Sequence, residues 1–61
     1  MIAGSKILVE NHRGILEYGA ERIVINLDKG KISLSGTGFV IDAMNKNELL
    51  INGRLQSADW E

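Results

Sequence analysis

Hydrophobic and polar residues alternate along most of the chain with the period of two that is typical of β-strands. Five runs show this alternation: "KILVE", "RIVINL", "KISLS", "FVIDA" and "ELLIN". β-branched and aromatic residues are concentrated in these runs, and Gly or Asn returns between them. "FVIDAMNKNELL" is long enough for a helix, but Asn45 and Asn47 interrupt it and β-branched residues lead it. The pattern therefore predicts an all-β fold.

The segments between the runs recur at a nearly constant spacing. "NHRG" ends at Gly14, "LDKG" at Gly30 and "MNKN" at Asn47, so the spacings are 16 and 17 residues. Gly and Asn adopt positive φ most readily, which suits a type I turn followed by a left-handed residue in a G1 bulge. We therefore interpret these three positions as structural turns between antiparallel hairpin strands.

The repeat extends into the strands that follow each turn. It makes Leu16 equivalent to Ile32 and Leu49, and a second set of glycines then follows at Gly19, Gly36 and Gly53. About seven short strands result, in hairpin repeats of 16–17 residues. Such short repeats must share one hydrophobic face, so we predict a small sandwich or partial barrel. A short β-solenoid is the alternative, because solenoids also repeat small residues at their corners.

Composition sets the size of the core and the ways in which it can be stabilised. The chain has 61 residues, no cysteine and one His, with a net charge of −1. We expect a single small domain, residues 1–61, whose core supports only marginal stability. Disulfides are excluded and a structural zinc site is disfavoured, so oligomerisation is the expected compensation. The abrupt opening "MIAGS" suggests the core of a longer protein.

The same totals bear on location and partners. The lack of cysteine is compatible with a cytoplasmic protein. No apolar run reaches the roughly 18–20 residues that a membrane span needs, so direct membrane insertion is not expected. The slightly acidic balance disfavours nucleic acid as a partner, because phosphate binding is driven by basic residues.

The stretch "ENHRGILEY" holds the only His and the only Tyr of the chain. A His can act as a base or metal ligand, and an Arg can bind a phosphate. However, His12 and Arg13 fall at the centre of a predicted turn, where exposed polar residues are ordinary, and no second His or Cys accompanies them. Glu10 and Glu17 flank the turn and are expected to pair with Arg13.

Other candidate chemistry is weaker still. "GTG" at 36–38 lacks the lysine and the following helix of a phosphate loop, and is expected to be a turn. The serines and threonines have no recognisable catalytic partners, and Asp42, Glu48 and Asp59 fall at solvent-facing or turn positions. We therefore expect no catalytic, cofactor-binding or metal-binding residues, and a protein that is not an enzyme.

Several apolar residues point instead to association. Trp60 is either a lid on the core or an anchor in an interface, where Trp is enriched. Four more apolar residues lie off the main alternation, and a sheet covered on both sides would explain them. Together with the turn residues His12 and Arg13, the predicted partner contacts are Trp60, Leu8, Val24, Val40 and Leu50.

Three stretches, "ILVENHRGILEY", "RIVINLDKGKISLSGTGFVID" and "NELLINGRL", resemble the YabP/YqfC family of sporulation proteins and its YqfC-like branch. The resemblance spans roughly residues 7–57, and "ENHRG" is its specific part. It implies a non-enzymatic protein of endospore formation in spore-forming Firmicutes. It also implies a membrane partner similar to the sporulation protein YqfD and a peripheral position at the developing forespore membrane. Family members usually carry additional N-terminal residues.

Two functional hypotheses follow. The first is a self-assembling or partner-docking β module in sporulation, which forms a homo-oligomer. The alternative is a Sm-like small-barrel module that binds RNA, because "LLINGRLQSAD" is similar to the second Sm motif. The acidic balance, the single Phe and the absence of interleaved basic and aromatic residues count against RNA binding.

Overall fold

The computed structural model describes residues 5–61 as one antiparallel sheet of five strands. The strands are β1 (Ser5–Glu10), β2 (Ile15–Tyr18), β3 (Arg22–Leu27), β4 (Gly30–Met44) and β5 (Glu48–Trp60). Their order in the sheet is β1-β5-β4-β3-β2, and every neighbouring pair is antiparallel. The all-β prediction is thus confirmed, while the solenoid alternative is wrong because its coils would stack with parallel strands.

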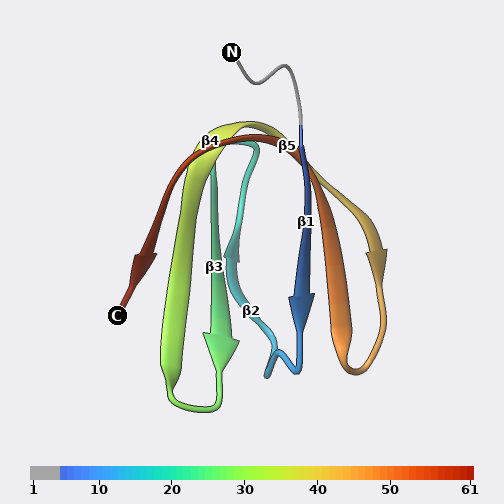
Figure 1. Cartoon of the computed structure of the whole chain (residues 1–61), viewed down its shortest axis with the longest axis vertical. Coiled ribbons are helices and arrows are strands. Elements are labelled where there is room, and N and C mark those ends of the chain that lie inside the picture. The colour runs from blue at the N-terminus through green and yellow to red at the C-terminus, as the bar shows by residue number, and fades with distance from the viewer. Residues whose placement is uncertain (1–4) are drawn as a thin grey trace.

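The described residues form five strands where about seven were predicted, because two expected breaks are bends. β4 continues through Gly36–Gly38, and β5 continues through Gly53. The ladder between them changes register between Ser35 and Gly36 and again between Thr37 and Val40. Such bulges bend a strand without ending it. In Figure 1 both strands arch over the top of the molecule and descend on its other side.

The bend lets the inner face of the sheet cover itself. Two arms result: one contains β2, β3, the first half of β4 and the second half of β5, and the other contains β1, the first half of β5 and the second half of β4. Their inner faces share one core, whose buried members are Ile23, Ile25, Leu34, Phe39, Leu49 and Ile51. Each of these residues lies on the parity that the alternation predicts for the core.

β2 departs from the predicted repeat. Ile15 packs against the core, whereas Leu16 is 57% exposed and therefore not equivalent to the buried Leu49. The register of β2 against β3 shifts between Ile15 and Glu17, so Leu16 lies in a bulge. The bulge turns its side chain outward. Tyr18 is also exposed, at 53%.

Two glycines and one aromatic ring make the bend. A Cβ at Gly36 would overlap the carbonyl oxygen of Arg54 and lie 2.8 Å from Cζ of Phe39. At Gly53, where φ is 154°, a Cβ would lie 2.7 Å from Cδ1 of the same ring. Phe39 itself is 2% exposed. The ring therefore packs directly on backbone, at two positions where any side chain would displace it.

The connection between β2 and β3 completes the bend. The N–H of Gly36 donates to the carbonyl of Glu21 at 3.0 Å, and the N–H of Phe39 donates to the carbonyl of Ala20 at 2.8 Å. These bonds satisfy two backbone donors at the place where the ladder is irregular.

The three predicted turns have three different structures. Gly30 ends a two-residue hairpin with φ of 143°, as predicted. Gly14 also has a positive φ, 117°, but its segment joins β1 to β2, which do not pair. Asn47 lacks a positive φ, and this prediction is wrong. Oδ1 of Asn45 instead accepts the N–H groups of Asn47 and Glu48 at 2.9 and 2.8 Å, which forms an Asx turn.

The structure of the bend predicts that substitutions at two neighbouring glycines lower the free energy of unfolding by unequal amounts. Gly36→Ala should lower the free energy of unfolding by about 3 kcal/mol or more, because backbone at Arg54 must move. Gly38→Ala, with φ of 65° and nothing within 4 Å of the new Cβ, should cost only about 1 kcal/mol through backbone strain. Urea denaturation measures both. Equal costs would contradict the proposed role of Gly36.

Candidate functional site

Three connections meet at one end of the molecule, the lower end in Figure 1. They are residues 11–14 between β1 and β2, the turn between β3 and β4, and the turn between β4 and β5. We call the depression between them the loop-end hollow, and its lining residues are Asn11, His12, Arg13, Gly14, Asp28, Lys46 and Asn47. A second hollow adjoins it and shares Asn11, Lys46 and Asn47.

The segment 11–14 connects the two arms of the bent sheet. The N–H of Asn11 donates to the carbonyl of Asn47 at 2.6 Å, on the side of β5. The N–H of Arg13 donates to the carbonyl of Asn26 at 2.7 Å, and the N–H of Asn26 donates to the carbonyl of Gly14 at 2.9 Å. Positive φ values at Asn11 and Gly14, 61° and 117°, give the segment the shape that this crossing needs.

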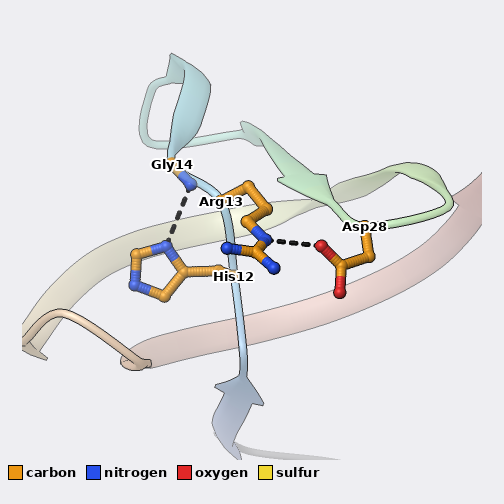
Figure 2. A network of polar contacts seen from close by, with 4 residues as sticks. All are labelled: His12, Arg13, Gly14 and Asp28. Atoms are coloured by element: carbon orange, nitrogen blue, oxygen red, sulfur yellow. Dashed lines mark hydrogen bonds and ion pairs between the residues drawn. The ribbon is translucent and has the colours of Figure 1, made fainter.

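His12 holds this crossing in place. Its side chain is 8% exposed, and Nδ1 accepts the N–H of Gly14 at 3.1 Å, as Figure 2 shows. Since Nδ1 is an acceptor, the hydrogen of the neutral ring is on Nε2, which donates to the carbonyl of Asn45 at 3.1 Å. The prediction of an exposed turn position for His12 is therefore wrong, because its ring fills the space between two loops.

Arg13 is exposed, as predicted, but its partner differs from the prediction. Nε donates to Oδ1 of Asp28 at 2.5 Å (Figure 2), whereas Glu17 pairs with Arg22 at 3.2 Å. The expected pairing of Arg13 with Glu10 or Glu17 is not found. The hydrogen bond from Arg13, reinforced by its charge, lowers the pKa of the Asp28 carboxyl.

The loop-end hollow is lined by charged and amide side chains that can bind a polar partner. Arg13 and Lys46 supply cations, Asn11 and Asn47 supply amides, and Asp28 supplies one carboxylate. Within residues 5–61, no group of three or more His, Cys, Asp or Glu side chains could hold a metal ion. The arrangement suits recognition of a polar surface through hydrogen bonds and charge.

The other predicted contact residues lie away from this hollow. Leu8, Val40 and Trp60 are 56%, 54% and 71% exposed, and Leu50 is half-buried. Val24 is only 6% exposed, so its assignment as an accessible contact is wrong. It lies between Glu17 of β2 and Ser33 of β4, whose strands flank it on both sides.

Sequence reasoning missed Asp28, Lys46 and Asn45 as members or supports of the site. Asn45 carried a signal, because an Asn in a predicted turn commonly accepts the backbone N–H two residues further on in an Asx turn. Asp28 and Lys46 carried none, since turn residues of either charge are common.

The model of the YabP family matches residues 1–61. The chain is also similar to the protein called "Uncharacterized protein YqfC" of Bacillus subtilis (strain 168), with 34% identity over 55 residues. The match covers 90% of this chain and 59% of that relative, so the chain spans about three-fifths of its length. Among residues 5–61, no helix has the length and apolar character that a membrane span requires.

Adjacent residues of the site should differ sharply in their effect on stability. His12→Ala should lower the free energy of unfolding by about 2 kcal/mol, because it empties a buried position and leaves the carbonyl of Asn45 and the N–H of Gly14 unpaired. Arg13→Ala should change it little, because both members of its ion pair are exposed. Thermal and urea unfolding compare the two variants. A His12→Ala protein as stable as Arg13→Ala would contradict the structural role of the ring.

The Arg13–Asp28 pair predicts a pH effect of known sign. Because the folded pKa of Asp28 is lowered, its contribution is present above the unfolded value of about 3.9 and is lost as pH falls through the folded pKa. Arg13→Ala should return the Asp28 pKa to near that ordinary value. Carboxyl-carbon NMR titration measures it, with Arg22→Ala as the control that leaves Asp28 unchanged.

Proposed function

Because the chain belongs to the YabP family, we propose that it is a non-enzymatic docking and self-assembling β module that acts in endospore formation. Family membership supports the association with sporulation. The wider proposal concerns the mode of action, in which the chain binds a membrane protein of the sporulating cell and lies peripherally at the forespore membrane.

The observation that carries the docking proposal is the contrast between the frame and the surface of the loop-end hollow. The frame is rigid, because the buried His12 ring and the backbone bonds of residues 11–14 fix three connections relative to one another. The surface is exposed, with Arg13 and Lys46 presenting their charges beside Asn47. Preorganised polar groups of this kind bind a partner without losing much loop entropy.

The charges of the hollow indicate the chemistry of the partner. Lys46 forms no ion pair within residues 5–61, and the exposed pair of Arg13 with Asp28 exchanges readily with solvent. A partner segment with carboxylate and carbonyl groups would satisfy both cations and the amide of Asn47. We propose such a segment, on the membrane protein, as the ligand of this surface.

Affinity capture from sporulating cells tests the docking proposal. A tagged chain expressed in a spore-forming bacterium, cross-linked and purified from the membrane fraction, should recover one membrane protein reproducibly. The double variant Arg13→Glu/Lys46→Glu should recover at least tenfold less, because it reverses both cations of the hollow.

Lys29→Glu is the matched control. Lys29 is also an exposed lysine in a tight turn, but it does not line the hollow. Its recovery of the membrane protein should equal that of the wild type. Equal recovery by all three proteins, each shown to be folded by circular dichroism, would reject the hollow as the docking surface.

A further inference from the structure

On the outer face of β1, the side chains change from basic to apolar to acidic along the strand. Ile7 and Val9 pack against the core. Since side chains alternate across a strand, Lys6, Leu8 and Glu10 project from the opposite face. This face therefore carries a cation at one end, a leucine at the centre and a carboxylate at the other end.

The neighbouring strand β5 repeats the leucine and the carboxylate of this order but has Asn52 in place of the cation. Leu49 and Ile51 are fully buried, so the residues between and beside them face outward. The register places Leu50 opposite Leu8, with polar residues opposite each other at both ends. We call this surface the leucine face, and its members are Lys6, Leu8 and Glu10 on β1 and Asn52, Leu50 and Glu48 on β5.

The centre of the leucine face is apolar and uncovered. Leu8 is 56% exposed and lies beside the half-buried Leu50. Val40, 54% exposed, extends the apolar area onto β4, where it lies opposite Asn52. Leu8 and Leu50 are direct cross-strand neighbours, whereas Val40 lies diagonally to Leu50.

The charges at the two ends are poorly neutralised within one chain. Glu10 and Glu48 are direct cross-strand neighbours, an arrangement that destabilises a sheet, and neither forms an ion pair within residues 5–61. Lys46 lines the second hollow together with both glutamates and offsets part of their charge. At the other end, Lys6 has only a long, exposed contact with Asp42, at 3.5 Å.

We infer that the leucine face binds a second copy of this chain around a two-fold axis. Lys6 and Glu10 lie two residues from Leu8 in opposite directions, each about 6.6 Å away along the strand. A two-fold axis in the interface, perpendicular to β1 and passing by Leu8, brings the leucines of both copies together. The same axis places Lys6 against the partner's Glu10 at both ends of the interface. The surface is thus complementary to itself, which a closed dimer requires.

The size of the face sets the strength of the dimer. Six residues of strand span about 20 Å, and three strands span about 14 Å, so two stacked faces bury about 560 Å² in total, which is below the area of a standard stable interface. We therefore expect a weak dimer, with a Kd on the order of 100 µM. The two sheets would stack as an aligned sandwich. This inference rests on the self-assembly part of the proposed function and uses none of the exposed docking groups of the loop-end hollow.

The first experiment measures self-association of the purified chain by sedimentation across a concentration series. The wild type should pass from monomer to dimer, and Leu8→Thr and Leu50→Thr should each raise the Kd at least tenfold. Leu16→Thr is the control, because Leu16 is 57% exposed, as Leu8 is, but lies on β2. A monomeric wild type at 1 mM, about tenfold above the expected Kd, would overturn the inference. A Leu50→Thr variant that associates normally would overturn it too, since the contact would then be the β1 edge.

The second experiment tests the proposed two-fold symmetry of the dimer directly. Lys6→Glu alone places Glu against Glu10 of the partner subunit, and Glu10→Lys alone places Lys against the partner's Lys6, so each variant should be monomeric. An equimolar mixture restores opposite charges at both ends and should form a heterodimer with a Kd within about tenfold of the wild-type value. A mixture that stays monomeric while both variants remain folded would overturn the proposed symmetry. The Leu8→Thr chain keeps the loop-end hollow unchanged and should recover the membrane protein as the wild type does, so failure of dimerisation and failure of docking are distinguishable.

Discussion

The packing of Phe39 on the backbone at Gly36 and Gly53 is the contact on which the rest of the structure depends. A single sheet of five strands has one apolar face and no second layer to cover it. Bending both long strands at these glycines brings the two arms face to face, so that β3 and β5 bury each other's isoleucines and leucines. A chain of 61 residues thereby obtains a closed core without a helix or a second sheet in its described part.

The loop end depends on this bend in turn. Residues 11–14 reach from β5 to β3 only because the arms stand close together. His12 then links backbone atoms of two loops that are 33 residues apart in the chain, and a flat sheet would separate them. The exposed cations of the hollow are therefore positioned by the same constraint that makes the core, and a disturbance at Gly36 should reach both.

The predictability of each segment follows the regularity of its pairing. The alternation identified the core-facing residues of β1 and β3 correctly, because both strands pair in an unbroken register. β2 is an edge strand, and its bulge moved Leu16 outward without any local signal. A glycine in the sequence can mark either a bend within a strand or a turn between strands. Gly36 was predicted to lie in a turn, but it lies in a bend of β4. His12 could not be placed, because its partners are backbone atoms that carry no sequence signature.

The outer faces of the two arms differ in how much apolar surface they expose, and this difference affects what the chain can bind. On the outer side of β3, Val24 is covered by its neighbours, and the residues beside it along the strand, Arg22 and Asn26, are polar. On the outer side of β1 and β5, the exposed Leu8 and the half-buried Leu50 lie between charges that the chain neutralises only in part. Bending buries the centre of the inner face, so that part of the sheet is not available for association. A domain this small that gains stability by assembling must use an outer face or an edge, and within residues 5–61 the arm of β1 and β5 presents paired leucines on its outer face.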